Sequence, residues 1–247
     1  MLSRGNFRRA KIVGYMNVER KANTLYSVGG NMFVTPGQQT CDLVDFKIVG
    51  GDYSSDTISF VQDDAPYIDT DKIFYYISAE ESGNDDEWTG WWYNDGSSKV
   101  ESFPIPAGTG FMCNFTMAGT KIIYSGEVQK GSDGVIEIER GNNQLYRFIG
   151  NPVPAPVDLL DVKVVGGDYS SDTISFLLKE DSIEDSDRVY YYISAEESGN
   201  DDDWTGWWLN DGSRKVERNE VVLAPGEGFF AYMTMDGSKI VFPAPKL

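Results

Sequence analysis

The stretch YYISAEESGNDDEWTGWW spans residues 75–92 and recurs at residues 191–208 with a single exchange of Glu for Asp. Extending outward from this stretch, residues 49–100 align with residues 165–216 without a gap, at a spacing of about 116 residues and with about 37 of about 52 positions identical. Close similarity at a fixed spacing is typical of a duplicated structural unit. The chain is therefore a tandem repeat.

The two copies also match beyond this region, with small insertions. GTGFMCNFTMAGTKIIY at residues 108–124 aligns with GEGFFAYMTMDGSKIVF at residues 226–242 after two extra residues in the second copy, and LYSVGGN at residues 25–31 aligns with LYRFIGN at residues 145–151. These matches place the boundary between the copies near Tyr124. We therefore expect three parts: a basic N-terminal arm at residues 1–11, a first β-domain at residues 12–124 and a second β-domain at residues 125–247.

Each copy has the pattern of several short strands separated by turns. Segments rich in Val, Ile, Thr, Tyr, Phe and Trp alternate with clusters of Gly, Asn, Asp and Ser, and no long run of helix-forming residues is present. Roughly seven or eight such strands in each copy are typical of a sandwich or small barrel. The sequence predicts an all-β protein made of two tandem β-sandwich or small β-barrel domains of the same fold.

Several motifs of the second copy also carry a family resemblance. In order, they are LYRFIGNPVPAPVDLLDV, YYYIS, WTGWW, LAPGEGFFAY and KIVF. The chain resembles a repeat of secreted and surface proteins from several bacterial groups, whose members carry N-L-I-G-N-P, G-W and P-G-E-G-F-F type motifs. The first copy departs from this pattern, with GGNMFV for GNPVP and AGTGFMC for PGEGFFA. The resemblance covers nearly the whole chain and implies a mature extracellular or cell-surface protein that is not an enzyme.

The charge and hydropathy of the chain exclude several classes of partner. The formal net charge is −18, with 21 basic residues against 39 acidic ones, whereas binding to nucleic acid phosphates needs an excess of Lys and Arg. The same imbalance disfavours anionic membrane surfaces. No hydrophobic stretch is long enough for a transmembrane helix, so we expect no membrane insertion.

The absence of histidine restricts the chemistry that the chain can perform. Without His there is no Ser-His-Asp or Cys-His nucleophile and no imidazole ligand for a transition metal. Carboxylate-only catalysis needs two acids that face each other across a cleft, and adjacent acids in a polar loop do not fit that arrangement. A disulfide between Cys41 and Cys113, the only cysteines, stays an open alternative. We expect a protein that is not an enzyme.

The N-terminal arm is basic, whereas the rest of the chain is strongly acidic. Removing its four bases leaves 17 bases against 39 acids, a balance of −22. Such an arm is attracted to an acidic surface, either its own or that of another copy. We therefore expect a structural subunit that assembles with other copies of itself into a filament or surface layer, whereas the alternative is a frayed terminus or the flank of a removed leader. The basic residues of the arm are Arg4, Arg8, Arg9 and Lys11.

Acidic residues gather before and after the aromatic strand of each copy. Several carboxylates in one loop are able to wrap a calcium ion, although the D-x-[DN]-x-[DN]-G loop with its later glutamate is absent. The alternative is a solvated loop whose acids maintain solubility. The weak calcium candidates are Asp69, Asp71, Glu80, Glu81, Asp85 and Asp86 in the first copy, and Asp185, Asp187, Glu196, Glu197, Asp201 and Asp202 in the second.

All tryptophans lie in the two copies of the duplicated stretch. Within each expected strand, two of them are neighbours in the sequence. Because successive side chains point to opposite faces, Trp91 and Trp207 are expected to face the core, and Trp92 and Trp208 to face outward. An outward indole is a flat platform for a sugar or an anchor for a protein contact, unless a loop, the other copy or the basic arm covers it. These two residues are our contact candidates, and glycan binding is the alternative function.

Overall fold

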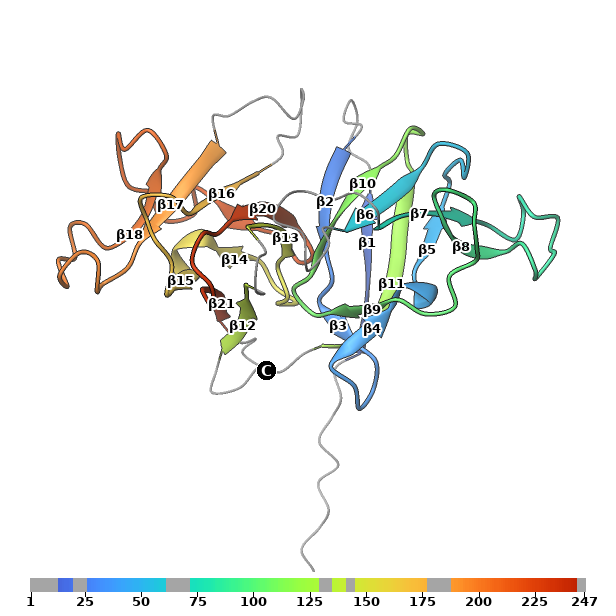
Figure 1. Cartoon of the computed structure of the whole chain (residues 1–247), viewed down its shortest axis with the longest axis horizontal. Helices are drawn as coiled ribbons and strands as arrows, with labels where there is room; N and C mark the ends of the chain where they lie inside the picture. The colour runs from blue at the N-terminus through green and yellow to red at the C-terminus, as the bar shows by residue number, and fades with distance from the viewer. Residues whose placement is uncertain are drawn as a thin grey trace, which may run out of the picture.

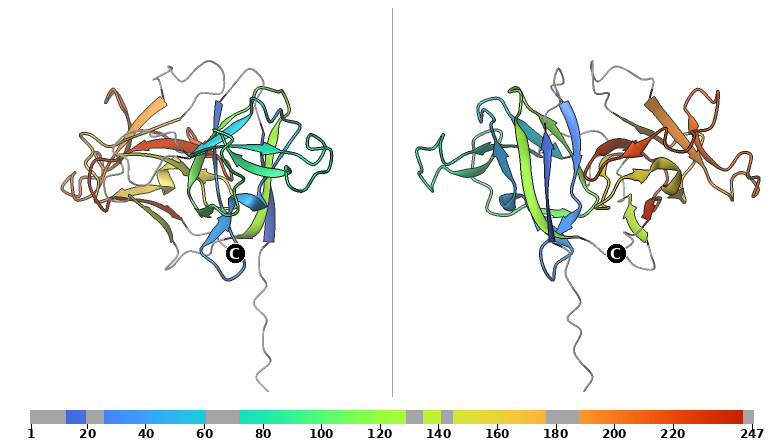
Figure 2. Two further views of the ribbon diagram at one scale, coloured as in Figure 1. Left: turned by 45° about the vertical axis from the view of Figure 1, so that its right-hand side comes forward. Right: turned by 180° about the vertical axis from the view of Figure 1, so that it is seen from behind.

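The computed structural model describes residues 13–19, 26–60, 72–128, 135–140, 145–176 and 188–243. Within these ranges the regular elements are β-strands and short 3-10 turns. Figure 1 shows two lobes, one coloured blue to green and one yellow to red, and Figure 2 shows the same division from two other directions. The prediction of an all-β chain with two tandem β-domains is confirmed.

The first domain contains a long series of short strands. In chain order they are β1 (Val13–Glu19), β2 (Tyr26–Gly30), β3 (Phe33–Val34), β4 (Thr40–Asp42), the 3-10 turn η1 (Leu43–Asp45), β5 (Lys47–Val49), β6 (Thr57–Phe60), β7 (Lys72–Ile77), β8 (Gly90–Tyr93), β9 (Pro104–Pro106), β10 (Gly110–Asn114) and β11 (Lys121–Val128). Strand β11 thus continues beyond the boundary expected near Tyr124.

The second domain repeats this series. Its elements are β12 (Val135–Glu139), β13 (Tyr146–Gly150), β14 (Val157–Asp158), the 3-10 turn η2 (Leu159–Asp161), β15 (Lys163–Val165), β16 (Thr173–Ser175), β17 (Val189–Ile193), β18 (Gly206–Leu209), β19 (Val222–Leu223), β20 (Gly228–Tyr232) and β21 (Lys239–Pro243). The two-residue strand β3 has no counterpart among the described residues of this domain.

Equivalent sheets form in both domains. The first domain has a five-stranded sheet in the order β2-β10-β6-β7-β8, and the second has β13-β20-β16-β17-β18. Opposite this sheet, β11 pairs with β1, β3 and β5, as β21 pairs with β12 and β15. Each large sheet therefore ends in the strand that carries two of the tryptophans, β8 or β18.

Each pair of sheets encloses its own hydrophobic core. Phe111 and Cys113 of β10 are buried, as are Ile122 and Tyr124 of β11, and the residues between them are more exposed. This alternation is the period-two pattern of strands with one buried face. The rings of Phe111 and Tyr124 approach to 6.4 Å between centroids, which joins the two sheets of the first domain.

The two cysteines are buried thiols and do not form a disulfide. Burial, with a smaller contribution from Asp45, raises the pKa of Cys41 to about 12, so this thiol stays protonated at neutral pH. Cys113 lies inside the same core, and its counterpart in the second domain is the buried Ala231. Both cysteines therefore act as small apolar residues.

The domains meet through an almost symmetrical backbone contact. The N–H of Gly30 donates to the carbonyl of Gly226 at 2.8 Å, and the N–H of Gly150 donates to the carbonyl of Gly108 at 3.0 Å. Gly30 and Gly150 occupy equivalent positions of the two copies, as do Gly108 and Gly226. The contact is thus of the self-complementary kind that a twofold axis generates, and the outer strands β8 and β18 point away from it (Figure 1).

No helix among the described residues is long and apolar enough to cross a membrane.

Candidate ligand-binding site

A loop at residues 78–89 joins β7 to β8, and the equivalent loop at residues 194–205 joins β17 to β18; we call these the tip loops. In the first tip loop, the N–H of Ser78 donates to the carboxylate of Glu81 at 2.8 Å, and the N–H of Glu81 donates to the hydroxyl of Ser78 at 3.2 Å. The other Glu81 oxygen accepts the N–H of Tyr53 at 3.2 Å. Glu81 therefore fixes the start of the loop to a neighbouring turn.

The second half of each tip loop is also held by its own polar groups. Asp85 accepts the N–H of Glu87 at 2.9 Å, and its carbonyl accepts the hydroxyl of Thr89 at 2.8 Å. The hydroxyls of Thr89 and Ser82 lie 2.7 Å apart and share a hydrogen bond. The same interactions recur in the second domain around Glu197, Asp201, Ser198 and Thr205. The same set of internal hydrogen bonds therefore holds the backbone of the tip loop in both domains.

This framework presents one tryptophan at the surface of each domain. Trp88 is 55% exposed and Trp204 is 56% exposed. Trp88 stacks on Trp92 with centroids 5.4 Å apart and planes at 17°, and Trp204 stacks on Trp208 at 5.4 Å and 18°. The indole N–H of Trp92 donates to the carbonyl of Trp88 at 2.9 Å. The exposed Trp88 ring therefore packs flat against an indole that is itself held by a hydrogen bond.

A lysine from the next turn completes the support of each stacked pair. Lys99 lies beside Gly90, where an added Cβ would come within 3.1 Å of Lys99 Cε. Its Nζ donates to the carbonyls of Asp86 at 2.7 Å and Glu87 at 3.3 Å. In the second domain the equivalent Lys215 Nζ lies 6.0 Å from the ring centroid of Trp208, within cation–π range.

The aromatic surface extends across the sheet beyond the stacked tryptophans. Tyr75 of β7 lies directly opposite Trp92 of β8 in the antiparallel register, so both side chains share one face. Tyr53, 45% exposed, lies 6.5 Å from Tyr75 between ring centroids. We call the four side chains Trp88, Trp92, Tyr75 and Tyr53 the aromatic row. In the second domain the aromatic row consists of Trp204, Trp208, Tyr191 and Tyr169.

Polar groups along the row keep fixed protonation states. Burial, followed by the influence of Tyr53 and Asp95, raises the pKa of Tyr75, so its phenol stays protonated at neutral pH. Hydrogen bonds from the hydroxyl and N–H of Ser97 lower the pKa of Asp95, so this carboxylate stays ionised. The row thus offers rings flanked by hydrogen-bond acceptors in an acidic domain, an arrangement suited to a neutral ligand that carries hydroxyl groups.

Two of the four tryptophan predictions for the strands are confirmed outright. Trp91 and Trp207 are each 1% exposed, and their indole N–H groups donate at 2.8 Å to the carbonyls of Phe46 and Val162. Trp92 and Trp208, the contact candidates, are half-buried. Trp88 and Trp204 stack on them, and Lys215 lies near the ring of Trp208. These contacts were not predicted from the sequence. A tryptophan four residues before each outward indole was the available signal.

The acidic candidates of the tip loops serve mainly as acceptors for the loop itself. Glu81 and Asp85 accept backbone N–H groups, as do Glu197 and Asp201, whereas Glu80, Asp86, Glu196 and Asp202 are exposed. Within the part of the chain that the structure describes, no three acidic or cysteine side chains are grouped to hold a metal ion. Calcium binding stays a prediction of the sequence. The remaining candidates, Asp69, Asp71, Asp185, Asp187, Arg4, Arg8, Arg9 and Lys11, lie outside the described residues.

No family model matches the chain, and no curated protein and no solved structure matches it significantly.

Proposed function

We propose that the chain is a non-enzymatic binding module whose two ends take the same ligand, a neutral glycan. The observation that carries this proposal is the aromatic row, which occurs twice with the same stacking geometry and the same exposed tryptophan. Sugar rings place their C–H faces on such rings, and Trp and Tyr provide large rigid contact areas at low entropic cost. The net charge of −18 favours a neutral glycan over an anionic one.

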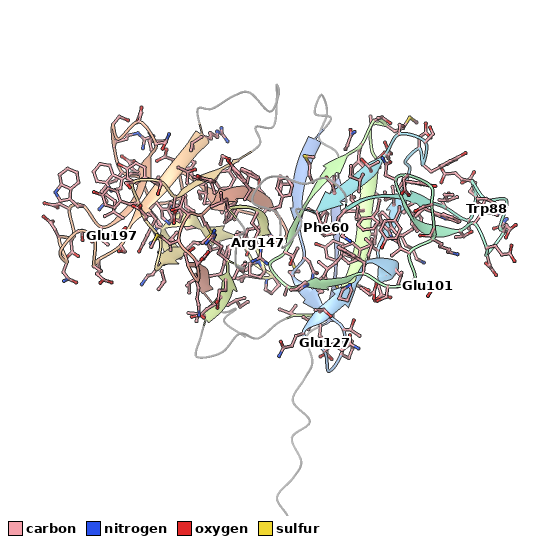
Figure 3. The ribbon with its side chains drawn as sticks, in the orientation of Figure 1. Phe60, Trp88, Glu101, Glu127, Arg147 and Glu197 are labelled. Carbon is pink, nitrogen blue, oxygen red and sulfur yellow. The ribbon has the colours of Figure 1, made fainter. Side chains whose placement is uncertain are left out.

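The two aromatic rows lie at opposite ends of the molecule, which suits simultaneous binding of both rows. Trp88 is at the outer end of one domain, and Glu197, in the tip loop that carries Trp204, is at the outer end of the other (Figure 3). A polymer with repeated sugar units is able to engage both rows, and linked sites raise overall avidity by roughly 10²–10⁴. The module would therefore cross-link or retain polysaccharide chains rather than modify them.

Replacing the exposed tryptophans tests this function. A Trp88→Ala, Trp204→Ala double variant should lose binding on an array of neutral glycans. Each single variant should keep one site and lose the avidity gain of two linked sites, roughly 10²–10⁴-fold. The matched control is Met117→Ala with Met235→Ala, which removes another exposed apolar pair of equivalent positions. Binding of the double variant at the level of the control would contradict the proposal.

Self-assembly is our second candidate, and the charge asymmetry of the sequence favours it. Residues 1–11 carry Arg4, Arg8, Arg9 and Lys11 without an acid, against an acidic remainder, so the arm of one copy is attracted to the body of the next. A head-to-tail contact of this kind builds filaments when it does not close a ring. Removing residues 1–11 should abolish assemblies seen by electron microscopy, and assemblies that persist unchanged would sink this candidate.

A further inference from the structure

The two domains place the same pair of aromatic rings side by side on their central strands, and a third ring packs against the pair in the first domain. In the first domain, the ring of Phe103 lies 5.0 Å from Phe60 and 4.9 Å from Phe74 between centroids. Phe60 and Phe74 themselves lie 6.1 Å apart with their planes at 69°, and the equivalent Phe176 and Tyr190 lie 5.9 Å apart at 75°. The geometry of this pair is thus the same in both copies, but among the described residues of the second domain no ring stands in the place of Phe103.

Val221 stands where the first domain has Phe103. The carbonyl of Phe103 accepts the N–H of Leu43 at 3.0 Å, and the carbonyl of Val221 accepts the N–H of the equivalent Leu159 at 2.9 Å. The backbone position is therefore the same in both domains. The side chain is much smaller in the second domain, so the described residues leave the space of the phenyl ring open.

A pocket of about 220 Å³ occupies this place in the second domain. For comparison of size, an enclosed apolar cavity of roughly 150 Å³ in a protein core binds benzene, whereas this pocket is open to solvent and is lined partly by charged side chains. The pocket is therefore large enough for a phenyl or phenol ring. Its lining residues are Phe176, Arg188, Tyr190, Glu220, Val221, Val222 and Glu227.

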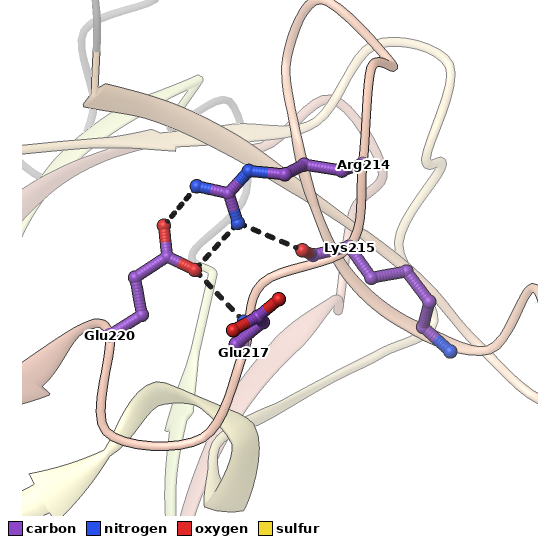
Figure 4. Close-up of polar contacts among 4 residues, drawn as sticks. All are labelled: Arg214, Lys215, Glu217 and Glu220. Atoms are coloured by element: carbon purple, nitrogen blue, oxygen red, sulfur yellow. Dashed lines mark hydrogen bonds and ion pairs between the residues drawn. The ribbon is translucent and has the colours of Figure 1, made fainter.

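A polar network specific to the second domain fixes one wall of the pocket (Figure 4). Glu220 receives two hydrogen bonds from the Arg214 guanidinium, at 2.6 and 2.8 Å, and one from the N–H of Glu217 at 2.9 Å. The first domain has Ser98 in place of Arg214 and lacks Glu220 because of the two-residue insertion. The hydrogen bonds from Arg214 lower the pKa of Glu220 to about 2, so the wall keeps its charge pair at neutral pH.

We propose that this pocket of the second domain binds an aromatic side chain from a peptide segment of a partner protein. Phe103 shows how such a ring packs against the pair of aromatic rings. At the rim, the exposed Arg188 is a donor and the half-buried Glu227 an acceptor, which together suit the carbonyl and N–H groups of a peptide backbone. Residues 177–187, which connect Phe176 to Arg188, contain no aromatic residue, so this connection supplies no ring for the pocket.

Two substitutions and a small aromatic probe test the pocket: Val221→Phe fills it, and Phe103→Val opens the equivalent place in the first domain. N-acetyl-L-phenylalaninamide is titrated into the full chain while the valine methyl signals are followed by NMR, with N-acetyl-L-leucinamide as the control probe. The aromatic probe should bind saturably, shift the methyl signals of Val221 and Val222, and bind at least several-fold more tightly than the control. Val221→Phe, which copies the first domain, should weaken binding tenfold or more. Phe103→Val should add a second binding event in the first domain.

Several outcomes would overturn the proposal. They are unchanged probe affinity in Val221→Phe, equal binding of both probes, and shifts confined to residues away from the pocket. Because Phe103→Val removes a core ring and is open to misfolding, Val221→Phe decides the proposal alone if that variant does not fold. A Val221→Phe protein that keeps the methyl signals of its other valines and its glycan binding while losing the probe site would support the pocket and separate it from the aromatic rows.

Discussion

Gly30→Ala is expected to separate the two domains while leaving both hydrophobic cores folded. A Cβ atom at Gly30 would lie 2.1 Å from the Cα of Gly150, and one at Gly150 would lie 2.0 Å from the Cα of Gly30. Neither atom is able to move aside, because both belong to the backbone of an edge strand that is already paired within its own domain. Forced overpacking costs roughly 1–3 kcal/mol, and a clash between two backbones belongs at the upper end of that range.

Loss of the contact between the domains in Gly30→Ala should change the cooperativity of unfolding as well as the stability. Calorimetry of the variant should resolve two melting transitions, one for each core, and small-angle scattering should report a larger radius of gyration. Gly37→Ala is the control, because Gly37 has a positive φ of 82° but no atom within 4 Å of an added Cβ. That change strains only the local backbone, by roughly 1–2 kcal/mol. Identical melting and scattering of the two variants would mean that the glycine contact does not hold the domains together.

The sequence predicted the fold well because duplication and strand alternation are local signals. The repeat of the YYISAEESGNDDEWTGWW stretch and the parity of Trp91 against Trp92 need no tertiary information. The contact between Gly30 and Gly150 was not predictable, because a glycine required by a neighbouring domain has the same appearance in a sequence as a glycine required by a turn. The arrangement of the two domains therefore came from the structure alone.

The candidate site was predicted only in part. The outward orientation of Trp92 followed from strand parity, but the stacking of Trp88 on it depends on the shape of the tip loop, which Glu81 and Asp85 determine through hydrogen bonds to backbone N–H groups. The acids were interpreted from composition as calcium ligands or as a solvated loop. Their capping role became visible only when the backbone donors of the loop were located.

The pocket of the second domain was beyond sequence reasoning for a different reason. The exchange of Phe103 for Val221 falls beside a two-residue insertion, so the alignment alone does not establish that the two side chains are equivalent. The shared hydrogen bond to Leu43 and Leu159 establishes it. The two extra residues lie in the turn before β19, and Val157 pairs with Leu223 as Cys41 pairs with Ile105. The strand register is therefore kept, which is why the fold tolerates the insertion.

Asn31→Ala is expected to unfold the first domain or to lower its stability by at least about 4 kcal/mol. The side chain is fully buried. Its amide group donates to the carbonyls of Phe33, Ile105 and Pro106 at 2.9, 3.0 and 3.2 Å, and its oxygen accepts the N–H of Phe33 at 2.9 Å. Each buried polar group left without a partner costs about 1–3 kcal/mol of stability. The free energy of unfolding of a whole domain is only about 5–15 kcal/mol.

The duplication supplies an internal test of this argument. Asn151 is also fully buried and makes the equivalent bonds to Val153, Leu223 and Ala224, with a bond to the carbonyl of Ala155 in place of the one to the carbonyl of Phe33. Asn151→Ala should therefore destabilise the second domain by a similar amount. Chemical denaturation followed by hydrogen exchange would assign each loss to its own domain, with the exposed Asn94→Ala as the control. Equal protection of both domains in both variants would contradict the prediction. A selective loss would show that these asparagines hold β9 and β19 to the cores, next to the inter-domain glycines Gly30 and Gly150, which directly precede them in the chain.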